Sequence, residues 1–326
     1  MLAPLTADRA GQEWLDAMRR GDFPAAWEIS DAVLAARDPA TRDDPALPFH
    51  LRWVWDGRPL EGRSVLVRCY HGLGDTLQFC RYVPLLRPRV AALTLETQPE
   101  LVPLLTRLLG LDQVVPFDVE RPLPASDAAI EIMELAHALR LPPPAPPYLH
   151  LMSRCPHDAG LSVGLCWAAG GWDPDRSVPV NALAPLTVLP GLHLVSLQRG
   201  SAAAGAGAWL FATAQDHSMD VLRTARTVAG LDLVVTVDTM VAHLAAALGR
   251  PTWLLLKFDA DWRWGRTHSP WYPAVRQFRQ SVQGDWTAPI AALVRDLRRR
   301  LKVCGPDKHV DTQTQGTAPP VPTTPP

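Results

Sequence analysis

Residues 231–251 read L-D-L-V-V-T-V-D-T-M-V-A-H-L-A-A-A-L-G-R-P and give the clearest indication of the fold class. An apolar run ends at Val237 and leads directly into a helical segment, which Gly249 and Pro251 bring to an end. A buried strand followed at once by a helix is the repeating unit of a parallel α/β sheet. The free amides and the dipole at the start of such a helix favour an anion, for example a diphosphate.

Three polar residues make this unit a candidate binding site. Asp238 and Thr239 open the helix, and His243 follows Thr239 by one turn on the same face. A capped crossover helix with a hydrogen-bonded core histidine is an equally good interpretation of these residues. Both interpretations stay open on the sequence alone.

The same alternation of strands and helices extends to both sides. Expected strands lie at 64–69, 91–96, 113–116 and 127–132, and again at 162–167, 192–197, 231–237 and 252–256. Expected helices lie at 75–86, 99–109, 134–141, 180–188, 217–229, 239–248 and 286–301. The Pro-rich segment LPPPAPPYL at 141–149 is suited to a stiff linker between two halves. We therefore expect two α/β domains, at 55–150 and 160–301, with ligands at the carboxyl edges of their sheets.

The two ends of the chain have a different character. Residues 1–50 contain a helical hairpin with a Gly-Asp-Phe-Pro turn at 21–24, and it resembles one unit of a tetratricopeptide repeat. It is either a hairpin packed on the next domain or a partner-binding remnant of a longer array. Residues 303–326 are rich in Pro and Thr and lack an apolar face, which predicts a disordered tail.

The turn H-G-L-G-D-T at 71–76 follows the first expected strand and is the second candidate site. Gly72 and Gly74 permit tight backbone turns and the close approach of a ligand. Asp75 stands where the next helix begins, so it is either the helix N-cap or a carboxylate that accepts a proton in the cleft. His71 precedes the turn and is a weaker candidate for the same site.

Further polar residues follow other strands of the second half. Arg176 and Ser177 end a Gly-rich loop, and the planar fork of an arginine suits phosphate oxygens. Gln198 lies in the turn S-L-Q-R-G, directly after an expected strand. The loop D-W-R-W-G-R-T-H-S-P-W-Y-P at 261–273 is either an aromatic platform for a base or sugar ring or a packed corner.

Composition narrows the classes of function. The 326 residues carry 32 Lys and Arg against 33 Asp and Glu, a net charge of −1, which argues against a mainly electrostatic nucleic-acid binder. The five Cys residues lack metal-ligand spacing and the D-x-D triplets at 173–175 and 259–261 are weak signals, so we expect no metal and no cofactor. With no secretory signal and no apolar run near the ~18 residues of a membrane span, we expect a soluble, cytoplasmic protein.

The order of these segments resembles a known family. The order is strand–GLGD–helix, Pro-rich linker, GLCWA and RS, SLQ, LDLVVTVDTMVAHLAAALGRP, and then DWRW and SPWYP. It resembles the glycosyltransferase family nine, or heptosyltransferase-like, domain that bacteria often append to tetratricopeptide repeats. The resemblance implies a GT-B fold, two Rossmann-like domains facing a cleft, with Asp75 as the catalytic base. The residues that it implies at the nucleotide-sugar donor are Asp238, Thr239, His243 and Arg176.

The resemblance implies an inverting glycosyltransferase that needs no metal. It would move a sugar from a nucleotide-diphosphate donor to a hydroxyl of a glycan or protein acceptor, in bacterial surface glycan synthesis or protein glycosylation. The alternative is a non-catalytic GT-B scaffold or sugar-nucleotide-binding protein, with the N-terminal helices holding a protein partner. A nicotinamide enzyme is disfavoured, because neither half carries G-x-G-x-x-G after its first strand.

Overall fold

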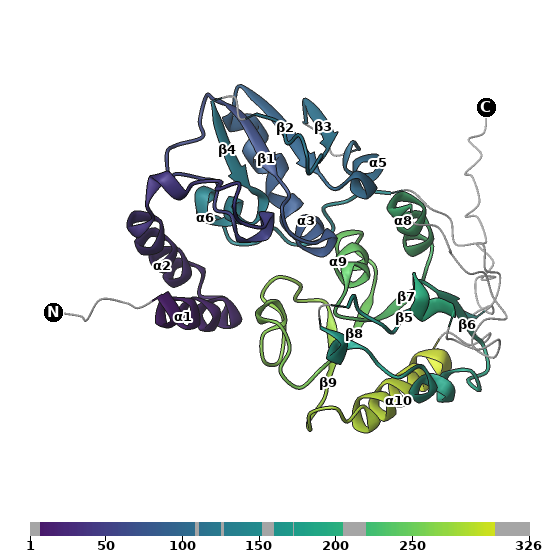
Figure 1. The fold of residues 1–326 in the computed structure, drawn as a ribbon. Coiled ribbons are helices and arrows are strands. Elements are labelled where there is room, and N and C mark those ends of the chain that lie inside the picture. The colour runs from purple at the N-terminus through teal and green to yellow at the C-terminus, as the bar shows by residue number, and fades with distance from the viewer. Residues whose placement is uncertain are drawn as a thin grey trace, which may run out of the picture.

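The computed structural model describes residues 7–107, 111–124, 127–151, 160–171, 173–204 and 220–303. They form two parallel β-sheets, each with its own helices, and an N-terminal helical hairpin (Figure 1). We call the part around the first sheet the N-terminal half and the part around the second sheet the C-terminal half. The tail expected to be disordered, 303–326, lies outside the described residues except for residue 303.

The first sheet has four parallel strands in the order β3-β2-β1-β4. Strand β1 lies between β2 and β4, so that Val67 pairs with Leu95 on one side and with Ile130 on the other. All three side chains are fully buried. A strand that is buried on both faces needs such a continuous apolar run. The strands are β1 (Ser64–Arg68), β2 (Ala92–Thr97), β3 (Gln113–Pro116) and β4 (Ala128–Glu131). The helices are α3 (Leu73–Phe79), α4 (Val83–Leu86), α5 (Val102–Leu105) and α6 (Leu135–Leu139).

The second sheet has five parallel strands in the order β6-β5-β7-β8-β9. Its central strand β7 is buried along its whole length, and the helix α9 follows it after two residues. The strands are β5 (Leu161–Cys166), β6 (Leu192–Ser196), β7 (Leu233–Val237), β8 (Thr252–Leu256) and β9 (Arg276–Arg279). The helices are α7 (Ser201–Ala204), α8 (Val221–Ala229), α9 (Met240–Ala247) and α10 (Thr287–Val303).

The hairpin consists of α1 (Ala7–Arg20) and α2 (Phe23–Ala36). The Asp22 side chain, in the turn between the helices, caps α2 by accepting from the Ala25 amide. On one side, the ring of Trp14 meets Trp262 of the C-terminal half edge-on at 5.1 Å. On the other side, Asp31 pairs with His137 of the N-terminal half. The hairpin therefore contacts both halves.

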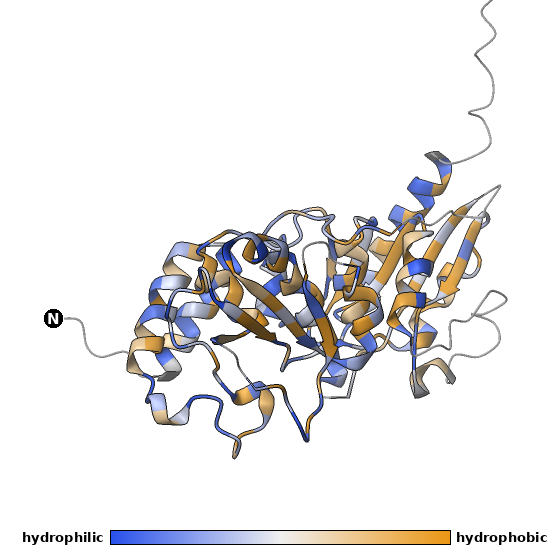
Figure 2. Cartoon of the chain, turned by 90° about the horizontal axis from the view of Figure 1, so that it is seen from above, coloured by the Kyte–Doolittle hydropathy of each residue, from blue (hydrophilic) through white to orange (hydrophobic). Residues whose placement is uncertain are grey.

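The two halves share one hydrophobic core. A single cluster of buried side chains joins Trp27 of the hairpin, Leu77 of α3, Leu244 of α9 and Trp271 of the aromatic loop. A second cluster lies within the C-terminal half, around β5, β7 and α10. Figure 2 shows hydrophobic residues concentrated along the strands of both sheets. Because helix α3 packs directly against α9, the carboxyl ends of both sheets are held close to each other.

The α/β class, the parallel sheets and the N-terminal hairpin are confirmed, while several expected helices are different. The helix expected at 75–86 begins earlier, at Leu73, and gives way to a 3-10 turn at Cys80–Tyr82 before α4. The segment expected as a helix at 180–188 is a 3-10 helix, Val180–Leu186, with Pro185 inside it. Proline lacks the amide that an α-helix interior needs, which explains why this segment does not become α-helical. Strand β9 was not expected.

Among the described residues, no helix is both long enough and apolar enough to cross a bilayer.

Candidate active site

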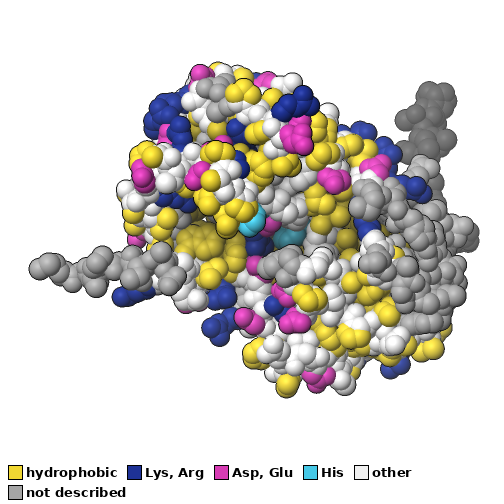
Figure 3. Space-filling model, viewed as in Figure 1, with side chains coloured by type: hydrophobic (Ala, Val, Ile, Leu, Met, Phe, Trp, Pro, Cys, Tyr) yellow, Lys and Arg dark blue, Asp and Glu magenta, His cyan; other side chains and the backbone are white. Residues whose placement is uncertain are grey.

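A cleft of about 860 Å³ lies between the two halves, where the carboxyl ends of the strands meet. Figure 3 shows the molecule hollowed at this place, with basic, acidic and histidine side chains gathered in the hollow. Each half contributes: the turn at 71–75 from the N-terminal half, and the residues after β5, β6, β7 and β8 from the C-terminal half. Leu15 and Arg19 of the hairpin also line the cleft.

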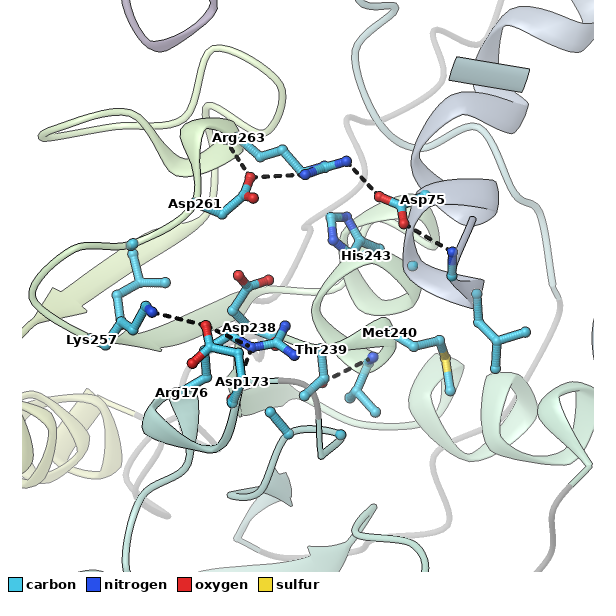
Figure 4. Close-up of a pocket in the computed structure, with 18 of the residues that line it drawn as sticks. Asp75, Asp173, Arg176, Asp238, Thr239, Met240, His243, Lys257, Asp261 and Arg263 are labelled. Atoms are coloured by element: carbon cyan, nitrogen blue, oxygen red, sulfur yellow. Dashed lines mark hydrogen bonds and ion pairs between the residues drawn. The ribbon is translucent and has the colours of Figure 1, made fainter. Parts of the chain in front are cut away.

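Asp75 lies in the first turn of α3 and faces the cleft (Figure 4). Its Oδ2 accepts from the backbone amide of Gly72 at 3.1 Å, and its Oδ1 accepts from Nη2 of Arg263 at 2.5 Å. Gly72 is the N-cap residue, so the interpretation of Asp75 as the N-cap is wrong, and Asp75 is the third residue of the helix. Asp75 therefore stabilises the helix start through Oδ2, while its Oδ1 faces the C-terminal half.

Arg263 is a site residue that the sequence analysis did not identify. It belongs to the aromatic loop, in a 3-10 turn at Trp262–Trp264, and its guanidinium lies 4.4 Å from the ring centroid of Trp262. Besides Asp75, it donates to Asp261 at 2.9 Å and to the Gln78 side chain at 2.7 Å. Only 9% of Arg263 is exposed. In the sequence, Arg263 stands out only as a cation between two tryptophans. That pattern does not reveal its partner Asp75, which is 188 residues away.

The start of α9 forms the opposite wall of the cleft. Thr239 is the N-cap residue, and its hydroxyl accepts from the Val241 amide at 3.3 Å. Asp238 is buried, and this burial, together with the negative charge of Asp261, raises the pKa of Asp238 to about 6. Nη1 of Arg176 donates to the backbone carbonyl of Asp238 at 2.9 Å. Arg176 therefore holds the turn between β7 and α9 in position.

A second cation lies beside Arg176. Lys257, directly after β8, pairs with Asp173 through a contact of 2.8 Å between Nζ and Oδ2. Arg176 approaches the same carboxylate oxygen at 3.6 Å. Two cations that share one aspartate thus stand next to the helix start, where Asp238 also lies, and guanidinium and ammonium groups suit phosphate oxygens. Arg176 was expected at the site from its sequence pattern, whereas Lys257 was not.

His243 lines the cleft but is 95% buried, at the contact between α9 and α3. Its Nδ1 forms a hydrogen bond of 3.0 Å with the hydroxyl of Tyr272. Burial, helped by the nearby charge of Arg263, lowers the pKa of His243 well below its ordinary value. The imidazole is therefore neutral, and any role at the donor is that of a hydrogen-bonding group rather than a cation.

Gly74, directly before Asp75, serves the contact between the halves. A Cβ atom on Gly74 would lie 2.9 Å from Cδ2 of His243, so only glycine lets α3 approach α9 this closely. The expected close approach at Gly74 is thus that of another helix. His71 lines the cleft, and its backbone carbonyl accepts from Gln98 at 2.6 Å. Burial lowers the pKa of the His71 side chain.

Gln198 and Ser177 shape the loop after β5. The side-chain oxygen of Gln198 accepts from the amides of Trp167 and Ala168, at 3.0 and 2.8 Å. The Ser177 hydroxyl accepts from the Ala169 amide at 3.0 Å. Gln198 also lines the cleft, so the loop that it holds forms part of the wall. The hydrogen bonds of Gln198 and Ser177 described above hold backbone amides of this loop in place.

The two D-x-D triplets take part in ion pairs. Asp173 pairs with Lys257, and Asp261 pairs with Arg263. Within the described ranges, no group of three or more His, Cys, Asp or Glu side chains is arranged to hold a metal ion.

Comparison with known proteins gives the same fold. Residues 218–280 match the family model described as glycosyltransferase family 9 (heptosyltransferase). That range runs from the segment before α8 through α9 to the aromatic loop and β9, and so includes Asp238, Thr239, His243 and Arg263. The chain is similar to the structure of E. coli ADP-heptose LPS heptosyltransferase II, with a TM-score of 0.54, 17% identity, and coverage of 74% of this chain and 99% of that one.

Two further relatives extend the comparison. The E. coli heptosyltransferase WaaC with ADP-2-deoxy-2-fluoro heptose gives a TM-score of 0.53 at 15% identity, over 73% of this chain and 99% of WaaC. Protein FlbA of Caulobacter vibrioides is 25% identical in an alignment 315 residues long, and the match covers 83% of this chain. The chain spans about half of FlbA, 52% of its length. The arrangement of two parallel sheets is therefore that of the GT-B heptosyltransferases.

Proposed function

We propose that this chain is a glycosyltransferase that moves a sugar from a nucleotide-diphosphate donor to an acceptor hydroxyl, with inversion at the anomeric carbon. The family match over 218–280 and the GT-B fold support the donor class. The observation that carries the proposal is geometric. One cleft brings a carboxylate on α3 opposite a capped helix start with two cations beside it.

The C-terminal half would hold the donor, and the N-terminal half the acceptor. We propose that the diphosphate lies at the start of α9, where Thr239, Arg176 and Lys257 line the cleft. Helix amides and cations that are already in position can stabilise the negative charge that grows on the leaving diphosphate. Positive charge supplied in this way can serve in place of a divalent cation.

Asp75 would act as the general base. As the acceptor oxygen attacks the anomeric carbon, its proton passes to the Asp75 carboxylate, the bond from the anomeric carbon to the diphosphate oxygen breaks, and the nucleoside diphosphate leaves. Asp75 suits this role because it faces the cleft with a quarter of its side chain exposed, so an acceptor can reach it. Arg263 orients the carboxylate through Oδ1.

The test is a donor panel. The purified chain is incubated with nucleotide sugars, and release of nucleoside diphosphate is measured with and without acceptors. We expect release with at least one donor, and loss of release by Asp75→Asn while the variant still binds the nucleotide. A wild-type chain that binds nucleotide sugars but releases none across the panel would favour the scaffold interpretation and contradict the proposal.

A further inference from the structure

A buried glutamine of α3, Gln78, connects the candidate base to the aromatic loop. Gln78 follows Asp75 by three residues, so the two side chains leave the same face of the helix. The Oε1 atom of Gln78 accepts from Nε of Arg263 at 2.7 Å, and the residue is fully buried. Gln78 is not among the residues that line the cleft, so a substrate bound there does not touch it. Any influence of Gln78 on sugar transfer must therefore pass through a neighbouring side chain.

The guanidinium of Arg263 is that neighbour, and each of its three nitrogens makes a bond. Nε donates to Gln78, Nη1 donates to Asp261 at 2.9 Å, and Nη2 donates to Asp75 at 2.5 Å. Figure 4 shows the guanidinium between Asp261 and Asp75. Because a guanidinium is rigid and planar, two bonds in its plane fix the direction of the remaining donor. The bonds to Gln78 and Asp261 thus determine where Nη2 points.

These two bonds hold the guanidinium to different parts of the molecule. Asp261 lies two residues from Arg263 and belongs to the same loop, so it moves with the loop. Gln78 belongs to α3, the helix that carries Asp75. The bond to Gln78 therefore sets the guanidinium relative to the helix of the candidate base. Catalytic groups must be held to within roughly 0.5 Å of their productive positions, and a bond of this kind supplies such precision.

The turn of α3 that carries Gln78 is itself held to the aromatic loop. The backbone carbonyl of Gln78 accepts from Nε of Arg81 at 2.7 Å, and Nη1 of Arg81 donates to the carbonyl of Trp271 at 2.9 Å. Arg81 is buried, and its guanidinium lies 4.5 Å from the ring centroid of Tyr272. Gln78 is consequently linked to the loop twice, through its side chain and through its backbone, which fixes the position of Oε1.

The amide nitrogen of Gln78 indicates that its oxygen matters. Nε2 is buried and has no hydrogen-bond partner among the residues that the structure describes. A buried donor without a partner lowers stability, so glutamine is an unfavourable residue for filling space in this core. A methionine would fill a similar space without a buried amide, but it could not accept from Arg263 in the same way. The bond from Arg263 to Oε1 is therefore the feature that requires glutamine here.

We propose that Gln78 is a positioning residue for sugar transfer. Its oxygen fixes the rotation of the Arg263 guanidinium, and Nη2 of that guanidinium in turn holds the Asp75 carboxylate toward the cleft. This inference rests on the proposed function, because it assigns Gln78 to the step in which Asp75 accepts the acceptor proton. A purely structural role would change the stability of the chain without a rate effect that depends on Arg263.

Steady-state kinetics of Gln78→Met test the proposal, with the fastest donor of a panel of ADP-, UDP- and GDP-sugars. We expect kcat to fall about tenfold, because the base is no longer held in place, while KM for the donor stays within about twofold, because the diphosphate site is untouched. Should Gln78→Met not fold, Gln78→Leu takes its place with the same expectations. An unchanged kcat, whatever the KM, would overturn the proposal.

A kinetic double-mutant cycle shows whether the effect passes through Arg263. Arg263→Ala should lower kcat at least as far as Gln78→Met does. In the Arg263→Ala background, Gln78→Met should change kcat by less than about twofold, because the guanidinium that Gln78 orients is gone. An equal loss of kcat in both backgrounds would overturn the proposal.

Gln280→Met is the matched control. Gln280 is buried, and its Oε1 accepts from the amides of Phe258 and Gly284. Its Nε2 likewise has no hydrogen-bond partner within the described ranges, and Gln280 does not line the cleft. We expect kcat of Gln280→Met to stay within about twofold of the wild type, even if its melting temperature falls. An equal loss of kcat in both glutamine variants would trace the loss to general damage of the core and would overturn the proposal.

Crystal structures of the wild type and of Gln78→Met give a readout that needs no activity. We expect Nη2 of Arg263 and Oδ1 of Asp75 to move apart, from 2.5 Å to more than about 3.5 Å, while the backbone of α3 stays in place. A retained contact would overturn the inference, even in a chain that transfers sugar. A wild-type chain that turns over no donor of the panel would instead contradict the proposed function, and the two structures would still decide whether Gln78 orients the pair.

Discussion

Nη2 of Arg263 in the C-terminal half lies 2.5 Å from Oδ1 of Asp75 in the N-terminal half, across the cleft. The same guanidinium also binds Asp261 in its own loop and Gln78 on α3. The aromatic loop is thereby fastened to the helix that carries the candidate base. The position of the Asp75 carboxylate consequently depends on how the two halves sit against each other.

We expect Arg263 and Asp75 to be energetically coupled. Arg263→Ala should destabilise the chain by about 2–3 kcal/mol, less than for a fully buried pair because Asp75 is 26% exposed. Once Asp75→Asn is present, the same substitution should cost about 1 kcal/mol less. The measurement is a double-mutant cycle by urea unfolding. Additivity to within about 0.5 kcal/mol would mean that the pair does not stabilise the contact between the halves.

Asp75→Asn should lower the rate of sugar transfer by about 10²–10⁴, because an amide cannot accept the proton. The substitution should also lower the free energy of unfolding by about 1 kcal/mol. Asn has one side-chain oxygen, and Asp75 uses two, one for Gly72 and one for Arg263. The control is Asp259→Asn, another aspartate that lines the cleft. Retained activity in Asp75→Asn would shift the role of base to His71, beside the same turn.

Gly74→Ala should destabilise the packing of α3 on α9 by about 1–3 kcal/mol. The new methyl group would lie 2.9 Å from the His243 ring, which is buried and bonded to Tyr272 and so cannot move aside easily. Gly72→Ala is the matched control, because its Cβ would meet only the Asp75 carboxylate, at 3.3 Å. Thermal melting of both variants checks this. Equal melting temperatures would show that the helices can separate without cost.

Asp238 should make the chain less stable as the pH rises toward 6. Its pKa is about 6 in the folded chain, against roughly 3.9 when unfolded, so the folded state binds more protons between these values. Asp238→Asn removes the buried charge. The variant should be more stable than the wild type at pH 7.5, by on the order of 2 kcal/mol, and equal to it near pH 4. Urea unfolding across this range is the measurement, and a difference that does not vary with pH would contradict it.

His243→Ala should weaken nucleoside diphosphate binding about tenfold if the imidazole contacts the donor. Because burial lowers the pKa of His243 well below its ordinary value, the effect should be the same at pH 6 and pH 8. Tyr272→Phe is the control, since it removes the partner of Nδ1 without changing the imidazole. Affinity is measured by calorimetry. Unchanged affinity in His243→Ala would leave this histidine as a core residue.

Much of the fold could be predicted because it depends on local patterns. The strands around Val67 and Val237 are short apolar runs next to turn residues, and such runs form parallel strands wherever helices cover them. Thr239 was expected at the start of its helix for a similar reason, because a hydroxyl before an apolar helical run caps it locally. The length of the helix after Gly72 was harder to predict, since a proline at position 84 and packing divide it.

Some features of the candidate site could likewise be predicted from local patterns, and others could not. The positions of Asp75, Thr239 and Arg176 after strands could be predicted from local patterns, and the parallel topology carries such residues to one edge of each sheet. Three features appear only in the folded chain: Arg263 binds Asp75, Lys257 shares Asp173 with Arg176, and the hairpin borders a second cavity beside the cleft. These contacts join residues far apart in the chain. They depend on how two sheets and a hairpin dock, and the docking is set by complementary buried surfaces rather than by any local pattern.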